Sequence, residues 1–530
     1  MLTKPLLKRF ILFSLLAILG SCAQIVNPTG GAKDDKPPVV TETKPDNQST
    51  SFAKNKIIIR FDEFIQLNNP DDQIIISPPL GVKPTFVNKG KTLEVLIKDS
   101  IRNNTTYTIN FGNSIGDNKE NNLLSGFSYV FSTGLTIDSN KVQGVLQQAF
   151  NNKPEKDFTI GLYAASGFVD SIIYHKKPLY LTKTDELGHF SIFNLPLDSF
   201  KLIAFKDDNK NLKYDKNEAL AYYNKSIGSA DTLQYVLKSY TPDAYKPGKI
   251  IDTFSNETNK VVIVAYKPYN THFKELQNKA LYVNHIKQAN GIDTFYAYTT
   301  DYAKDSLIRI GLSINDTTHL LAVKNRSLLK PAKFSYSFSK QLDLGDSIRI
   351  KFNAPLLKYD TSRILILKDS LKIKYKITQH SPFEITIFSE WDEKSTYQFK
   401  LLDSAFTSVY KDFTIKNNQL YTTKSFKDYA SLVLHVKLKQ PNKHQYILQL
   451  TDVEEKNISY QYIIKKEQDI VIQYVTPGVY QAKIIYDANN NGIWDNGDYA
   501  RQIQPERVSY YADKISLKAY WDLEQSLLID

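Results

Sequence analysis

Two short stretches of the sequence place oxygen-bearing side chains at alternating positions. The first, loop A, presents Asp207, Asn209, Asn211, Asp215 and Glu218, with the backbone carbonyl of Lys213 between them. The second, loop B, presents Asp487, Asn489, Asn491, Asp495 and Asp498, with the carbonyl of Ile493. Ca²⁺ takes roughly six to eight oxygen ligands, and a loop with ligands at positions 1, 3, 5, 7, 9 and 12 can surround it. The spacing therefore predicts a structural calcium site in each loop.

The two loops resemble the calcium loops of EF-hand and dockerin-like segments, with differences. Loop B has Gly492 at the sixth position, where a sharp turn favours glycine, whereas loop A has Leu212. Both loops are flanked by strand-like stretches, 202–205 and 482–486, rather than by helices. A polar hairpin loop held by Asx turns, in which Asn and Asp side chains bond their own backbone, explains the same residues. The sequence leaves both interpretations open.

A third candidate for chemistry is Cys22, the single cysteine of the chain. It follows a basic segment containing Lys4, Lys8 and Arg9, and then an apolar run from Phe10 to Leu19 that is too short to span a bilayer core of ~30 Å. The sequence Leu19-Gly20-Ser21-Cys22 resembles a bacterial lipobox. This resemblance implies a signal peptide over residues 1–21 and a lipid on Cys22, which would make the membrane a partner. An ordinary signal peptide is the alternative.

Composition and motifs argue against two classes of function. The formal net charge is +11, but acidic residues lie between the basic ones and no long run of like charges occurs. A nucleic-acid groove needs a concentrated basic stripe, so we expect no nucleic-acid partner. The sequence contains no nucleophile elbow, zinc-protease motif, phosphate-binding loop or dinucleotide fingerprint. We therefore expect a protein that is not an enzyme and has no cofactor beyond the possible structural calcium.

The elements that must position these residues are strands. The chain holds 34 Tyr and 28 Phe, residue types that favour strands over helices. After a tether over 22–36, short β-branched or aromatic runs alternate with turn residues. Such runs occupy 57–61, 73–77, 93–98, 106–111 and 127–132. The stretch 271–288 lacks Gly and Pro and is compatible with a helix, but its periodicity does not decide the matter.

Two families of β-sandwich are recognisable. Residues 37–135 resemble bacterial Ig-like domains through Pro37-Pro38-Val39, Ile59-Arg60-Phe61-Asp62-Glu63 and Tyr129-Val130-Phe131-Ser132-Thr133. The segment Thr184-Asp185-Glu186-Leu187-Gly188-His189-Phe190 is similar to carboxypeptidase-regulatory (transthyretin-like) modules, which carry no peptidase chemistry. The early Ig-like strand recurs as Ile348-Arg349-Ile350-Lys351-Phe352. Asp207 recurs as Asp487, and the two repeats lie at a similar distance along the chain. This collinearity predicts a duplicated pair of modules.

The predicted fold class is thus all-β, with tandem β-sandwich modules, Ig-like and transthyretin-like, after a lipoprotein signal peptide. The expected boundaries are a signal peptide over 1–21, a tether over 22–36, an Ig-like domain over 37–135, a transthyretin-like domain over 139–242, a β-rich domain over 243–328, a second Ig-like domain over 329–428 and a second transthyretin-like domain over 429–530.

These features predict a non-enzymatic cell-envelope lipoprotein that presents its modules as a spacer or a binding surface, with an envelope protein or a glycan as possible partner. Ala23 follows the anchoring cysteine where an inner-membrane retention signal has Asp, so we expect the outer membrane, on either face. The alternative is a glycan- or peptide-binding accessory lipoprotein of an outer-membrane uptake complex. Trp391, Trp494 and Trp521 could stack on sugar rings in that case, or else pack in the core.

Overall fold

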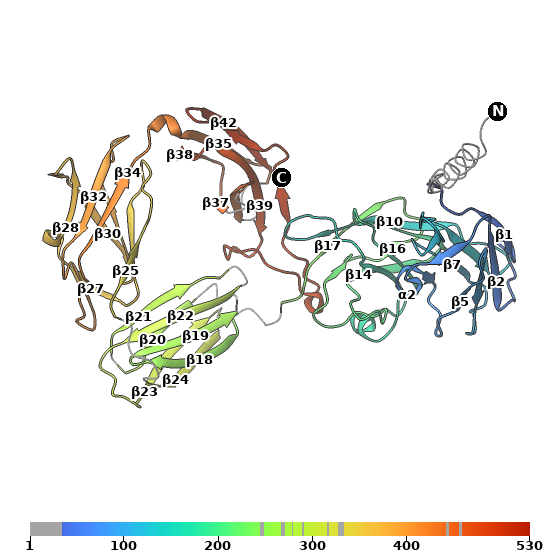
Figure 1. Ribbon diagram of the computed structural model, residues 1–530. Coiled ribbons are helices and arrows are strands. Elements are labelled where there is room, and N and C mark those ends of the chain that lie inside the picture. The colour runs from blue at the N-terminus through green and yellow to red at the C-terminus, as the bar shows by residue number, and fades with distance from the viewer. Residues whose placement is uncertain are drawn as a thin grey trace, which may run out of the picture.

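The computed structural model describes residues 34–243, 248–266, 271–277, 279–288, 291–314, 317–326, 333–440, 445–454 and 458–530. Cys22, the signal peptide and most of the tether lie outside these residues. In the described part of the chain, no helix is long and apolar enough to cross a membrane. Strands make up nearly all of the regular structure (Figure 1). The predicted all-β fold of tandem sandwich modules is confirmed.

Five groups of sheets follow one another along the chain, and we call them the first to fifth modules. The first module pairs a sheet of order β1-β2-β6-β5 with a sheet of order β4-β7-β9. Its strands are β1 (Val40–Lys44), β2 (Lys56–Phe61), β3 (Ile65–Leu67), β4 (Ile75–Ser77), β5 (Thr85–Asn88), β6 (Thr92–Leu96), β7 (Thr106–Asn110), β8 (Ile115–Asp117) and β9 (Ser128–Ser132), with a short helix α2 (Pro70–Gln73). All five strand runs expected in this region are present.

The fourth module has the same first sheet as the first module, in the order β25-β26-β31-β30. Its strands are β25 (Tyr336–Phe338), β26 (Ile348–Phe352), β27 (Leu356–Tyr359), β28 (Ile364–Lys368), β29 (Leu371–Lys372), β30 (Lys376–Ser381), β31 (Glu384–Phe388), β32 (Thr396–Leu401), β33 (Phe406–Ser408) and β34 (Asn417–Thr422). Along β26 the apolar residues are buried and Arg349 and Lys351 are exposed, as the alternation of side chains across a strand requires. The repeated sequence therefore forms a repeated structure.

The second and fifth modules also share a topology. In the second, β13-β10-β17 faces β12-β11-β14-β15; in the fifth, β38-β35-β42 faces β37-β36-β39-β40. The second module contains β10 (Asn140–Gln148), β11 (Thr159–Ala164), β12 (Tyr180–Lys183), β13 (His189–Leu195), β14 (Ser199–Phe205), β15 (Leu220–Tyr222), β16 (Ile227–Gly228) and β17 (Gln234–Ser239). The fifth contains β35 (Ala430–Leu438), β36 (Gln445–Asp452), β37 (Ile458–Ile464), β38 (Gln468–Val475), β39 (Gly478–Asp487), β40 (Val508–Tyr510), β41 (Ile515–Leu517) and β42 (Asp522–Ile529). In each module the first and last strands, β10 with β17 and β35 with β42, are neighbours and run parallel.

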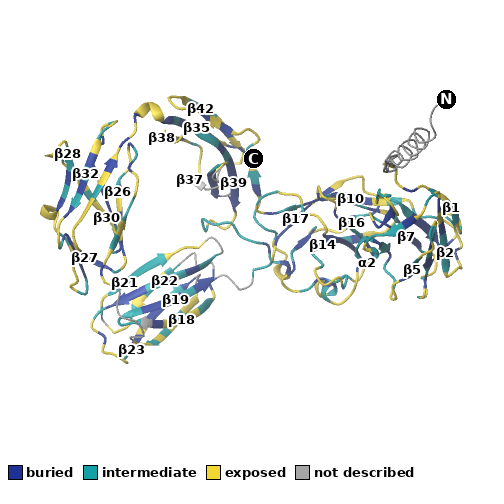
Figure 2. Ribbon diagram, in the orientation of Figure 1, coloured by how far each residue is buried: buried dark blue, intermediate teal, exposed yellow. Residues whose placement is uncertain are grey.

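The third module lies between the two repeated pairs. It consists of β18 (Ile250–Glu257), β19 (Lys260–Tyr266), β20 (Thr271–Glu275), β21 (Leu281–Ile286), β22 (Ile292–Thr299), β23 (Leu307–Ile314) and β24 (Thr317–Lys324). The stretch 271–288, which was compatible with a helix, forms β20 and β21 in two different sheets. Buried residues lie along the strands of every module (Figure 2), and each module has a main hydrophobic cluster of its own.

A tyrosine corner recurs in the first and fourth modules. The hydroxyl of Tyr107 accepts a hydrogen bond from the backbone N–H of Arg102 at 2.8 Å, and that of Tyr397 accepts one from Asp392 at 2.7 Å. Both rings are buried. Such a corner is characteristic of immunoglobulin-type sandwiches, where the hydroxyl satisfies the backbone of a strand connection. Each corner tyrosine follows a threonine, in Thr106-Tyr107 and Thr396-Tyr397, and the shared corner gives a physical reason for this repeated pair.

Replacing Tyr397 by phenylalanine should lower the free energy of unfolding of the fourth module by about 1–2 kcal/mol, because the N–H of Asp392 loses a buried acceptor. Tyr107→Phe should have the same effect on the first module. Hydrogen exchange of β32 and β7, resolved by mass spectrometry, measures each module separately. Tyr336→Phe is the control, because its hydroxyl contacts the exposed backbone of Ile415. Equal protection in Tyr397→Phe and the control would contradict the role of the corner.

Candidate functional site

Loop A leaves the end of β14 and returns before β15. The carboxylate of Asp207 accepts hydrogen bonds from the backbone N–H groups of Asn211 and Leu212, both at 3.0 Å. The side-chain amides of Asn209 and Asn211 both donate to Oδ2 of Asp215, at 2.7 and 2.6 Å. The first, third, fifth and ninth loop positions are therefore brought together by direct hydrogen bonds.

Loop B repeats this network bond for bond after β39. Asp487 accepts from the N–H groups of Asn491 and Gly492 at 3.1 and 2.8 Å. The amides of Asn489 and Asn491 donate to Oδ2 of Asp495, both at 2.7 Å. Asp487 is fully buried and also accepts from Nε2 of Gln445, a residue on the neighbouring strand β36, at 2.7 Å. Loop B is thus the more deeply anchored of the two.

The twelfth position differs between the loops. In loop A, Glu218 accepts from the N–H groups of Asp208 and Asp215, at 3.1 and 2.9 Å. Asp498, which we expected to have this role in loop B, instead accepts from the N–H of Arg501 and pairs with its guanidinium at 2.6 Å. It caps a short 3-10 turn that lies beyond the loop.

The residue equivalent to Glu218 in loop B is Glu506, which sequence reasoning missed. Its two carboxylate oxygens accept from the N–H groups of Ala488 and Asp495, at 2.8 and 3.1 Å. These are the same two loop positions that Glu218 holds in loop A. Burial raises the pKa of Glu506 to about 7 and also raises the pKa of Glu218. Each loop is therefore closed by a carboxylate in a partly dehydrated position.

The donor set of each loop fits a hard cation in its chemistry, since it offers carboxylate, amide and backbone oxygens. Within the described residues, no group of three or more His, Cys, Asp or Glu side chains is arranged to hold a metal ion. A cation in either loop would therefore depend on the Asn oxygens and on the carbonyl at Lys213 or Ile493. The Asn Oδ1 atoms at the third and fifth positions already accept Asx-turn bonds from the backbone, and a second lone pair remains on each.

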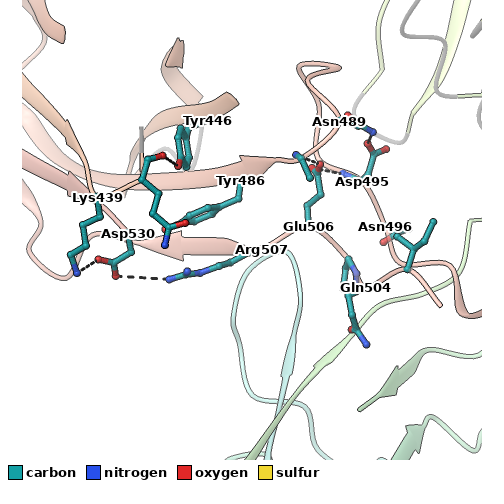
Figure 3. Close-up of a pocket in the computed structure, with 14 residues that line it drawn as sticks. Lys439, Tyr446, Tyr486, Asn489, Asp495, Asn496, Gln504, Glu506, Arg507 and Asp530 are labelled. Atoms are coloured by element: carbon teal, nitrogen blue, oxygen red, sulfur yellow. Dashed lines mark hydrogen bonds and ion pairs between the residues drawn. The ribbon is translucent and has the colours of Figure 1, made fainter. Parts of the chain in front are cut away.

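A groove of about 730 Å³ borders loop B (Figure 3). One wall carries the rings of Tyr446 and Tyr486, with the guanidinium of Arg507 lying 4.5 Å from the ring of Tyr486. Lys439 and Arg507 both face Asp530, at 2.5 and 3.9 Å. The other wall carries the side-chain amides and carboxylates of Asn489, Asp495, Asn496, Gln504 and Glu506. Aromatic faces beside hydrogen-bonding side chains are the usual composition of a small-ligand site.

The three tryptophans have three different environments. Trp391 is buried in the core of the fourth module and donates to the carbonyl of Asp346 at 2.6 Å. Trp494 lies at the eighth position of loop B, donates to the carbonyl of Glu506 and packs on Phe150 of the second module. Trp521 is half exposed, beside Lys518. The three do not form a line of exposed rings on one face.

Comparisons with known proteins support one part of this description. The family model of the bacterial Ig-like domain matches residues 34–133, so the chain carries an Ig-like domain at the position where the sequence resembled one. No curated protein matches the chain.

Several solved structures of tandem-module proteins are similar to the chain at low identity. The major pilin subunit BcpA of Bacillus cereus is 9% identical, covers 74% of this chain and 99% of its own, and has a TM-score of 0.14. Domains A168–A170 of titin are 10% identical; the match covers 46% of this chain and 92% of the titin chain, with a TM-score of 0.14. The Bacillus anthracis TIE protein is 8% identical; the match covers 95% of this chain and 76% of the TIE chain, with a TM-score of 0.15. TM-scores of this size describe no shared overall arrangement, so the fold rests on the chain's own sheets.

Proposed function

We propose that this protein is a non-enzymatic lipoprotein of the cell envelope, anchored through Cys22 to the outer membrane, whose β modules act as a spacer or a binding surface. The observation that carries the proposal is that consecutive modules are joined by specific contacts. The N–H of Leu181 donates to Ser77, Tyr410 donates to the carbonyl of Thr299, and the ring of Tyr429 in the core of the fourth module packs against Tyr474 of the fifth, with ring centroids 5.7 Å apart. Such contacts attach neighbouring modules to each other at defined places, as a spacer or a continuous binding surface requires.

Membrane fractionation of cells expressing the chain and its Cys22→Ala variant tests the anchor. The wild type should be found with the outer membrane and the variant should leave the membrane fraction, because the thiol that takes the lipid is gone. Cross-linked pull-down from native membranes then identifies the partner. Equal distribution of wild type and variant would contradict the anchor, and turnover of a substrate by the purified protein would contradict the non-enzymatic role.

Loops A and B support a further proposal, that each binds a calcium ion with a structural role. The identical hydrogen-bond networks bring the same Asn and Asp side chains together in both loops. In loop A the ligands would be Asp207, Asn209, Asn211, Lys213, Asp215 and Glu218. In loop B they would be Asp487, Asn489, Asn491, Ile493 and Asp495, and Glu506 would replace Asp498 as the ligand that closes the loop. Bound calcium would stiffen the loops and attach them to their modules.

Calcium at about 10 mM should stabilise each of these two modules by about 1.4 kcal/mol if the dissociation constant is about 1 mM, as in extracellular modules. Calorimetry of the full-length protein with calcium and with chelator measures the shift. The double variant Asp215→Asn/Asp495→Asn should lose it, and magnesium at the same concentration should not reproduce it. Identical melting in calcium and in chelator would leave only the Asx-turn interpretation of the loops.

The groove beside loop B favours a second candidate function, the binding of a glycan or a peptide as an accessory subunit of an uptake complex. Its combination of aromatic rings, guanidinium and amides is the observation behind it. A glycan array and a peptide library probed with the wild type and with Arg507→Ala test this function. Binding by the wild type that is lost in the variant supports it, and absence of binding by the wild type removes it.

A further inference from the structure

The fifth module returns to the second module, although the third and fourth modules separate them in the chain (Figure 1). The contact is made by residues 494–508, which we call the clasp. We propose that the clasp is a releasable contact that closes the second to fifth modules into a ring, and that the ring opens without unfolding any module. Its docking surface on the second module comprises Phe150, Asn152, Tyr222, Asn224 and Tyr240.

Aromatic rings form the centre of this contact. Tyr499 of the clasp packs edge-on against Tyr222, with ring centroids 5.0 Å apart. Trp494 packs against Phe150, also at 5.0 Å. Pairs of this kind stabilise a contact beyond the area that they bury. Gly497 lies so close to Tyr240 that a Cβ atom there would stand 2.6 Å from the tyrosine ring.

Side-chain amides surround the aromatic centre and give the contact its register. Gln504 donates to the carbonyl of Tyr222 at 3.0 Å, and Asn496 donates to the carbonyl of Thr241 at 3.0 Å. From the other side, Asn152 donates to the carbonyl of Val508 at 3.1 Å. Each bond joins an amide of one module to the backbone of the other, so the fit depends on both backbones.

The contact lies outside the main hydrophobic core of both modules. The main cluster of the second module contains Phe190 and Leu202, and that of the fifth contains Leu434 and Leu448; neither contains a residue of the other module. Tyr499 belongs instead to a separate cluster with residues of the outer side of the second module. Separation of the clasp therefore leaves both main cores closed.

The polar content of the contact favours release over permanent association. The hydroxyls of Tyr163, Tyr222, Tyr240 and Tyr499 are buried and have no hydrogen-bond partner among the described residues. A buried polar group without a partner is destabilising, and contact with solvent after release removes that penalty. Lys483 is also buried here, 3.0 Å from the centroid of the Phe150 ring, and burial lowers its pKa to about 8. These costs offset much of the aromatic packing.

The remaining module contacts determine what moves when the clasp opens. The third and fourth modules are joined by the bond from Tyr410 to Thr299, and the fourth and fifth by the packing of the Tyr429 ring against Tyr474. Asp243, where the chain leaves the second module, accepts from both Asn496 of the clasp and Tyr266 of the third module. Release of Asn496 would therefore let the third to fifth modules swing as one arm about residue 243.

Small-angle X-ray scattering of the full-length protein tests the proposal with two variants, one from each side of the contact. Gly497→Ala pushes against Tyr240 from the clasp, and Phe150→Ala removes the ring under Trp494. Both should raise the radius of gyration and the maximum dimension relative to the wild type. Trp521→Ala is the control, because this half-exposed residue of the fifth module lies outside the clasp.

Hydrogen exchange of the same samples separates opening from unfolding. The strands β35, β42, β10 and β17 should keep wild-type protection in the expanded variants, whereas residues 494–508 should exchange faster. Wild-type dimensions in both Gly497→Ala and Phe150→Ala would overturn the proposal. Expansion accompanied by loss of protection in β35 and β42 would also overturn it, since the contact would then be part of the fold of the fifth module.

Discussion

Replacing Asp487 by alanine should destabilise the fifth module by about 3 kcal/mol or more. Asp487 is fully buried, and its carboxylate is the common acceptor for Gln445, Asn491 and Gly492. Alanine leaves the amide of Gln445 and the N–H of Gly492 without this acceptor, in a place that water reaches poorly, and leaves the N–H of Asn491 only its bond to Asn489. Each unsatisfied donor costs about 1–3 kcal/mol, so the sum exceeds what a typical single substitution costs.

Hydrogen exchange of β36 and β39 measures this effect without interference from the other four modules, whose transitions overlap in a melting curve. A loss of about 3 kcal/mol corresponds to exchange more than about 100-fold faster where exchange requires opening of the module. Asp207→Ala is the matched control, since Asp207 holds the equivalent place in loop A but is only half buried and has no partner equivalent to Gln445. An effect of Asp487→Ala no greater than that of Asp207→Ala would contradict the special anchoring of loop B.

The second large effect is expected at Gly144, in the middle of β10. A Cβ atom at this position would lie 2.2 Å from the carbonyl oxygen of Tyr235 on β17 and 2.6 Å from the ring of Phe190 on β13. A rotamer change can move the ring, but it cannot move the backbone oxygen. Gly144→Ala therefore has to separate β10 from β17, and we expect a loss of about 3 kcal/mol or more, at the upper end of overpacking effects.

Gly311→Ala is the matched control for this substitution. Gly311 also lies inside a strand, β23, but its Cβ would meet the nearest atom of Leu276 at an ordinary 3.5 Å. We expect a change within about 0.5 kcal/mol, and a small gain is possible because alanine restricts the unfolded chain. Hydrogen exchange of β10 and β17 in one variant, and of β23 and β24 in the other, gives both values. Equal effects would show that close packing at Gly144 is not what excludes a side chain.

Much of the fold could be predicted from the sequence because buried and exposed residues alternate along its strands. Ile348 to Phe352 is an example, since its apolar residues all face the core. The stretch 271–288 was ambiguous because it contains no residue that breaks a helix, and only the pairing of β20 with β23 and of β21 with β22 decides its conformation. Local preference alone does not supply that information.

The loops show the same division between local and distant information. The bonds of Asp487 and Asp495 within the loop span only a few residues, so the spacing of side chains along the sequence carries information about them. Glu506 could not be found in this way, because the pairing of β39 with β40 brings it to the loop. The clasp was also unpredictable, since it joins Tyr222 to Tyr499 across two whole modules. The duplication did not indicate it, because the two modules contribute different surfaces.

The parallel pairing of β10 with β17 has a mechanical consequence. Because these neighbouring strands run in the same direction, the chain enters the second module at one end and leaves it at the other. Tension between a membrane anchor and the distal modules would pull the two strands past each other in shear. The ladder bonds would then share the load at once instead of breaking one after another. A module connected in this way resists extension along the axis on which an anchored protein would be pulled.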